Sequence, residues 1–150
     1  MRKIRPIILL VILVLAIGAL QAYREYHRPN KDLADEAAVC QVRDDLLIRD
    51  FQRDEQAAGK KYLGKVVAVE GIVKEIRQGE GGRITLALGK LNEASSVSCA
   101  IDSSHTGEIA GIRAGRSVIL KGFLIGFNRD ETGLLGSDVV VNRCVLVSVK

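Results

Sequence analysis

A long apolar segment in the middle of the chain, residues 62–76, places the strongest constraint on the fold. It is rich in valine and isoleucine, whose β-branched side chains favour strands. One glycine, Gly71, stands near its centre, where a strand tolerates a bend or the close approach of another backbone. We therefore expect a long, bent strand over residues 65–77, around which the rest of the domain is built.

Four further apolar segments follow, each with the length of a strand. We expect these strands at residues 83–88, 97–101, 117–127 and 138–149. Strict alternation in the first of the four predicts inward positions for Ile84, Leu86 and Leu88. In the next strand, Val97, Cys99 and Ile101 fall on one face.

A helix is predicted immediately before the long strand. Apolar residues recur there at helical spacing, with charged residues between them, at Leu47, Phe51, Ala58 and Tyr62. Asp44 or Asp45 can cap its start, and Gly64 follows the last apolar position as a stop. This pattern predicts an amphipathic helix over residues 44–62, packed outside the strands.

The order of these elements favours an OB-fold in a mainly-β domain over residues 44–150. Three strands form a meander, a longer connection follows, and two strands close as a hairpin. The glycines Gly71 and Gly122 lie within the first and fourth strands, where a small five-stranded barrel needs its strands to bend. Half of a β-sandwich is the alternative arrangement of five short strands.

The N-terminal 28 residues are expected to form a transmembrane signal-anchor. A short cationic start precedes an uninterrupted apolar run at residues 7–20, and a helix over residues 6–23 would span about 27 Å. A cleaved signal peptide, followed by export, is the alternative, but small residues at suitable spacing for cleavage occur only inside the apolar run. Membrane contact through residues 7–23 would be followed by a tether over residues 29–43.

The distribution of charged residues predicts the orientation of this anchor and bears on whether the domain binds nucleic acid. More basic residues precede the apolar run than follow it, which predicts a cytoplasmic N-terminus and an extracytoplasmic domain. The formal net charge of +4 comes entirely from the first 30 residues, because residues 31–150 contain equal numbers of basic and acidic side chains. A neutral domain makes nucleic acid an unlikely partner.

A family resemblance rests on residues in the predicted helix and strands. They are Phe51, Asp54, Glu55, Ala58, Tyr62, Gly64 and Lys65, then Val69, Gly71 and Val73, then Val97 and Cys99, then Gly115, Val118, Lys121, Gly122 and Gly126, and finally Asp138, Val139, Val140, Arg143 and Cys144. In order and spacing they resemble the tRNA-anticodon-like (tRNA_anti-like) family of bacterial OB-fold proteins, over about residues 46–147. The resemblance implies an OB-fold in a small membrane-anchored or exported protein, and it supplies a fold rather than a mechanism. We assign structural roles to Tyr62, Gly64, Lys65, Gly71 and Gly122.

The candidate ligand-binding residues follow from the way OB-folds bind. Their ligands lie across the second and third strands and against two loops, which correspond here to residues 77–83 and 128–137. We expect Arg77, Arg83 and Arg129 to line one mouth of the barrel, with Leu134 and Leu135 as an apolar tip. The predicted second and third strands lack the aromatic residues on which single-stranded nucleic acid stacks.

The sequence therefore predicts a non-enzymatic binding module at the cell envelope, with a protein or a saccharide as ligand. A single-stranded nucleic-acid binder, or a structural envelope protein without ligand, are the alternatives. One polar cluster, Asp102, His105 and Glu108, matches no spacing with a known catalytic mechanism. We therefore predict no catalytic residue, no metal site and no cofactor.

The three cysteines leave two interpretations open. Cys99 and Cys144 fall on strands that are neighbours in an OB barrel, which would allow a disulfide in an extracytoplasmic domain. Free thiols packed as small apolar side chains are the alternative. In either case Cys40, in the predicted tether, is left over.

Overall fold

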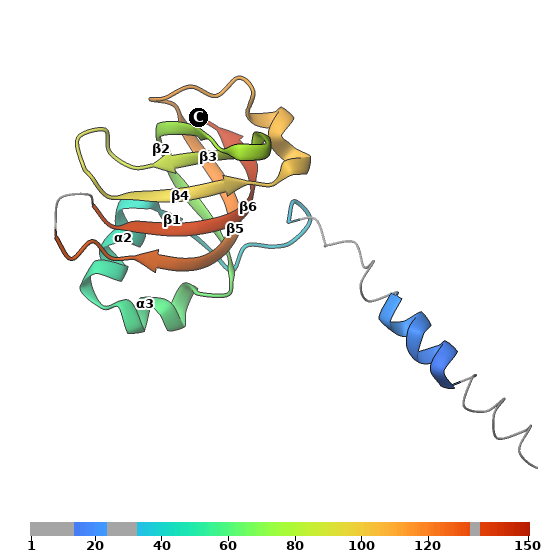
Figure 1. Cartoon of the computed structure of the whole chain (residues 1–150). Helices are drawn as coiled ribbons and strands as arrows, with labels where there is room; N and C mark the ends of the chain where they lie inside the picture. The colour runs from blue at the N-terminus through green and yellow to red at the C-terminus, as the bar shows by residue number, and fades with distance from the viewer. Residues whose placement is uncertain (1–13, 24–32, 133–135) are drawn as a thin grey trace, which may run out of the picture. The chain divides into compact units, whose positions relative to one another are not determined.

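The computed structural model describes residues 14–23, 33–132 and 136–150 (Figure 1). The chain divides into two compact units, residues 1–31 and 32–150. In the first unit, residues 14–23 form a helix whose side chains are all exposed. Among the described residues, no helix combines the length and apolar composition needed to cross a membrane. The predicted span over residues 7–23 lies only partly within the described part of the chain.

The second unit contains the following helices and strands in its described part: β1 (Cys40–Arg43), α2 (Asp44–Arg53), α3 (Glu55–Tyr62), β2 (Val66–Gln78), η1 (Glu80–Gly82), β3 (Ile84–Leu88), β4 (Ser96–Ile101), η2 (Ser103–Ile109), β5 (Ser117–Asn128) and β6 (Asp138–Val149). The five predicted strands are confirmed as β2 to β6, each within one residue at both ends. Leu86, Leu88, Val97, Cys99 and Ile101 are buried as predicted, and Ile84 is half-buried.

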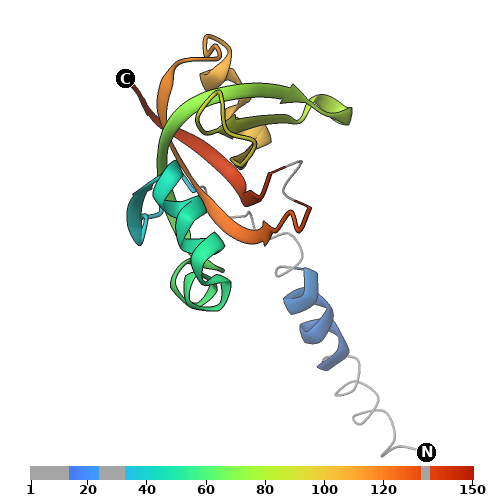
Figure 2. The same cartoon turned by 90° about the vertical axis from the view of Figure 1, so that its left-hand side faces the viewer.

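The strands close into an OB-like barrel. Their order is β1-β2-β3-β4-β6-β5, and β2 pairs with β5 to complete the ring. The long strand β2 makes this possible because it pairs with β5 over Val66–Ile72 and with β3 from Val73 onward. Figure 2 shows the curved path of β2, drawn in green, over the barrel. Closure of the ring excludes the half-sandwich alternative.

The predicted single helix is in fact two helices, α2 and α3. Asp54 separates them with an extended backbone, and its carboxylate accepts a hydrogen bond from the Ala57 amide at 2.9 Å. Aspartate favours this capping geometry over a position inside a helix, which accounts for the break. The predicted apolar stripe is confirmed, since its four members are buried in the core: Leu47, Phe51, Ala58 and Tyr62.

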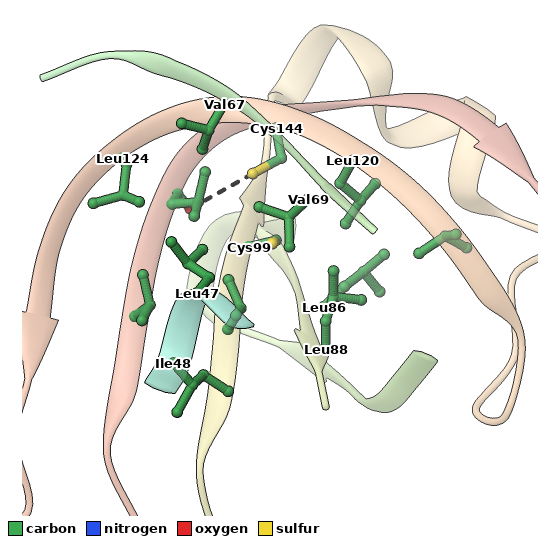
Figure 3. Packing of buried hydrophobic residues seen from close by; sticks show 14 of the residues in the cluster. Leu47, Ile48, Val67, Val69, Leu86, Leu88, Cys99, Leu120, Leu124 and Cys144 are labelled. Atoms are coloured by element: carbon green, nitrogen blue, oxygen red, sulfur yellow. Dashed lines mark hydrogen bonds between the residues drawn. The ribbon is translucent and has the colours of Figure 1, made fainter. Parts of the chain in front are cut away.

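The interior of the barrel is apolar. Figure 3 shows Leu47 and Ile48 of α2 packed with side chains from the strands, among them Val67, Leu86 and Leu120. Phe51 belongs to the same cluster and is 0% exposed, with its ring stacked on Phe127 at a centroid distance of 5.1 Å. The helix α2 is therefore part of the core rather than an external cover.

Residues 33–43, predicted as the end of a tether, pack against the barrel. Leu33 is 2% exposed and contacts Val66 and Val145, and the Lys121 ammonium donates to the Ala34 carbonyl at 2.8 Å. The strand β1 pairs in parallel with β2. Burial of Leu33 and this pairing bring the segment into the folded unit.

The Tyr62-x-Gly64-Lys65 motif closes α3 and joins it to the barrel. The Tyr62 hydroxyl donates to Asp50 Oδ2 at 2.8 Å, and this hydrogen bond lowers the pKa of the Asp50 carboxyl. Gly64 has φ +71° and donates its amide to the Leu124 carbonyl at 3.0 Å. The Lys65 ammonium donates to the Lys61 carbonyl at 2.6 Å, which satisfies an open acceptor at the helix end. We infer that these residues set where the helix stops and where β2 begins.

Gly71 and Gly122 lie where other groups come close to the backbone. A Cβ atom on Gly71 would be 2.5 Å from Asp44 Oδ2, and one on Gly122 would be 2.6 Å from Cys144 Sγ. Asp44 accepts hydrogen bonds from the Asp45 and Ile72 amides, while its burial raises the pKa of its carboxyl. The start of α2 is thus held against the bend of β2.

Cys99 and Cys144 are free, buried thiols in the structure, not a disulfide (Figure 3). They are not opposite one another, because Cys99 pairs with Val141 while Cys144 pairs with Ile101 beyond a bulge. Burial, together with the neighbouring Cys99 side chain, raises the pKa of the Cys144 thiol. A protonated thiol is a poor nucleophile, so Cys144 packs as a small apolar residue. The predicted bridge is thus absent from this structure.

Candidate ligand-binding face

The outer side of β3, β4 and β6 carries small, uncharged side chains. Because alternate residues of these strands point into the core, the residues between them point outward. We call these residues the outer floor: Thr85, Ser98, Ala100 and Val140, which are half-buried, and Ala87, which is 1% exposed. The strand register aligns Ala87 with Ser98 and Ser98 with Val140, and it aligns Thr85 with Ala100. The three strands lie side by side in Figure 1. Together these strands form an aromatic-free patch whose small side chains are only partly exposed.

Several charged groups around the outer floor are paired. On β2, the Arg77 guanidinium contacts Glu75 Oε2 at 2.8 Å. The pKa of Arg77 is raised, first by this hydrogen bond and further by the charge of Asp138. Asp138 in turn accepts a hydrogen bond from Ser96 Oγ at 2.6 Å. The rim therefore combines both signs of charge.

The structure does not bring the three predicted arginines together. In the strand register, Arg77 lies opposite Thr85, at the end of β3 that Arg83 and η1 precede. Arg129 follows Asn128, which lies opposite Asp138 at the start of β6. Arg129 Nε contacts Glu55 Oε2 at 3.3 Å, and its Nη2 donates to the Phe51 carbonyl at 3.4 Å. Arg129 thus ties the two helices to the barrel. Leu134 and Leu135 lie outside the described residues.

The polar cluster at residues 102–108 is engaged in local structure. Asp102 caps η2, accepting from the Ser104 amide at 3.1 Å and the Ser104 hydroxyl at 2.6 Å, and these bonds lower the pKa of its carboxyl. His105 Nδ1 lies 2.7 Å from Glu108 Oε1. Across residues 14–23, 33–132 and 136–150, no group of three or more His, Cys, Asp and Glu side chains is arranged to hold a metal ion.

A bulge in β6 adds a group to the rim that the sequence analysis missed. Arg143 has φ +53°, an unusual value for a residue with a side chain, and its amide donates to Asn142 Oδ1 at 2.9 Å. The register of β4 and β6 shifts at this point, opposite Ala100. The Arg143 guanidinium meets Asp102 Oδ2 at 3.3 Å, so another ion pair borders the outer floor. Alternation patterns contain no signal for such a bulge.

A cavity of about 520 Å³ lies elsewhere, between the start of α2 and the bend of β2. Charged side chains line it, and most of them have partners, but Asp45 Oδ1 is buried without a hydrogen bond. Arg43 contacts Asp45 at 3.2 Å, Lys90 contacts Glu93 at 2.6 Å, and Lys150 contacts Glu70 at 2.5 Å. We therefore place the candidate site on the outer floor and not in this cavity.

Solved structures include one whose similarity supports the fold, with a TM-score above 0.5, and two with lower TM-scores. A lipoprotein from Klebsiella pneumoniae that has been proposed to bind nucleic acid matches with a TM-score of 0.53 at 16% identity, over 81% of this chain and 100% of that chain. The asparaginyl-tRNA synthetase of Entamoeba histolytica matches with a TM-score of 0.44 at 18% identity, over 77% of this chain but only 25% of the synthetase. The corresponding enzyme of Pyrococcus horikoshii gives a TM-score of 0.38 at 19% identity, over 60% and 21% of the two chains.

No curated protein matches the sequence. The model of the tRNA_anti-like family, in contrast, matches residues 1–144, which is nearly the whole chain. The observed barrel and the order of its strands agree with that match. This chain therefore belongs to the tRNA_anti-like family.

Proposed function

We propose that this protein is a non-enzymatic binding module, anchored in a membrane by its N-terminal segment, that holds a protein ligand on the outer floor. The observation that supports a protein ligand is the character of this surface. It is formed by small, uncharged side chains, and its bordering charges are paired as Glu75–Arg77 and Asp102–Arg143. The outer floor shares the uncharged centre and polar rim of protein-binding surfaces, although it lacks the aromatic residues in which such surfaces are enriched.

The membrane anchor is supported by the described part of the N-terminal helix. Residues 14–23 are apolar except for Gln21, and each of their side chains is exposed. Apolar side chains on every side of a helix favour an apolar environment over water. With the basic residues before the span, we infer a cytoplasmic N-terminus and an extracytoplasmic domain.

Single-stranded nucleic acid is the second candidate ligand. It is favoured by the family's description and by the nucleic acid binding proposed for the Klebsiella pneumoniae lipoprotein. Proteins that bind single strands combine stacking aromatic rings with a positive groove. The outer floor has no aromatic side chain, and two of its bordering arginines, Arg77 and Arg143, are ion-paired. We therefore rank a protein ligand first.

Site-specific photocrosslinking tests the protein ligand. A photoreactive amino acid at Ser98, in the centre of the outer floor, is expected to capture a specific protein in intact membranes. The same probe at Gln56, an exposed position on α3, serves as the control. Adding Ala100→Arg should abolish the product at Ser98, because it places an unpaired charge on the floor. Identical products from Ser98 and Gln56, or a Ser98 product that survives Ala100→Arg, would contradict the proposal.

A further inference from the structure

The outer side of the barrel around β5 carries exposed apolar residues. Val39 is 66% exposed, Phe123 38%, Ile125 51% and Val147 54%. We call these four residues the β5 face. They lie around the segment that begins at Leu33. Leu33 packs on Val66 and Val145. Val66 is the cross-strand partner of Phe123, and Val145 lies two residues before Val147. The segment that begins at Leu33 therefore joins the barrel at an apolar surface that it covers only in part.

The β5 face borders the outer floor at β6. Gly126, which follows Ile125, pairs with Val140 of the floor, and Val147 of the face lies on the same strand as Val140. The other floor residues lie on β3 and β4, and β6 separates those strands from β5 in the ring. Contact through Phe123 and Ile125 therefore leaves the β3–β4 part of the outer floor accessible.

The chain leading to the β5 face limits what can cover it. Nine residues, 24–32, separate the apolar helix at residues 14–23 from Leu33. Even fully extended, the ten steps from Tyr23 to Leu33 span at most about 35 Å. When the helix is inserted in a membrane, the membrane therefore always lies within this distance of Leu33. Such tethering gives the membrane a high effective concentration at the β5 face.

We propose that the β5 face rests on the lipid surface, with Phe123 and Ile125 in contact with lipid. This inference rests on the membrane anchor of the proposed function. The outer wall of a barrel is convex, and a convex apolar surface lacks the concave shape that encloses a small ligand. A lipid surface needs no matching groove, and burial of apolar side chains in it is favourable. Contact through the β5 face leaves the β3–β4 part of the outer floor, beyond β6, free to meet a ligand.

Tryptophan fluorescence of the full chain in lipid vesicles tests this contact. The natural sequence has no tryptophan, so one introduced by Ile125→Trp is the only reporter. Leu91→Trp, at a 62% exposed position in the loop between β3 and β4, is the matched control. In vesicles of phosphatidylethanolamine and phosphatidylglycerol, Ile125→Trp should show blue-shifted emission that brominated acyl chains quench. Leu91→Trp should instead be quenched by acrylamide from the aqueous phase. Adding Phe123→Ser should reduce the quenching of Ile125→Trp by brominated lipid.

Two outcomes separate failure of this contact from failure of the anchor. If the chain does not float with the vesicles in a density gradient, the anchor itself is contradicted. If it floats but the tryptophan of Ile125→Trp is quenched only by acrylamide, the lipid contact is wrong and the anchor stands. Protection from both quenchers that increases with protein concentration would show a second copy on the β5 face and would also overturn the proposal.

Discussion

Replacement of Phe51 by alanine is expected to lower the free energy of unfolding by about 3–5 kcal/mol, because it removes a fully buried aromatic ring. Phe51 is 0% exposed and packs against Phe127 at 5.1 Å and Tyr62 at 6.1 Å between ring centroids. The substitution would leave a cavity between α2, α3 and β5. Chemical denaturation of the full chain measures the loss.

The control for this substitution is Leu46→Ala on the same helix. Leu46 is 44% exposed, so its truncation should change the free energy of unfolding much less, by well under half of the Phe51 value. A similar, small loss for both variants would show that α2 is not part of the core.

Replacement of Gly71 by valine is expected to destabilise the domain by about 1–3 kcal/mol, the usual range for overpacking a close contact. A Cβ atom at this position would lie 2.5 Å from Asp44 Oδ2 and 3.0 Å from Asp44 Cβ. The valine would therefore displace the start of α2 from the bend of β2. The melting temperature of the variant gives the comparison.

Gly126→Val is the matched control for Gly71→Val. Gly126 also lies in a strand of the barrel, but a Cβ atom there would have no heavy atom within 4 Å. We expect only a small change in its melting temperature. Equal melting temperatures for the two variants would mean that the approach of Asp44 to Gly71 does not constrain the barrel.

The strands could be predicted because the alternation of core side chains can be recognised within each strand's own sequence. Alternation at Leu86 and Leu88, and glycines at positions 71 and 122, are visible without any knowledge of contacts. The break at Asp54 was missed, because apolar spacing continues through it from Phe51 to Ala58. The pairing of β1 with β2 was also missed, since parallel pairing depends on residues far apart in the chain.

The candidate site was harder to predict than the fold. Arg129 was expected beside Arg77, but it pairs with Glu55, which is 74 positions away in the sequence. No local pattern indicates which of several acidic residues an arginine will meet. The bulge at Arg143 likewise depends on the register between β4 and β6. The small side chains of the outer floor were visible only as the alternate positions of predicted strands.

Titration of the full chain with single-stranded oligonucleotides, at low and at physiological salt, tests most directly whether the outer floor binds protein rather than nucleic acid. Binding through phosphate contacts weakens steeply as salt rises, in proportion to the number of cations involved. Because Arg77 and Arg143 are ion-paired, we predict no saturable binding at physiological salt. Tight binding that falls steeply with salt, and that is lost when Arg77 and Arg143 are replaced by alanine, would contradict the account.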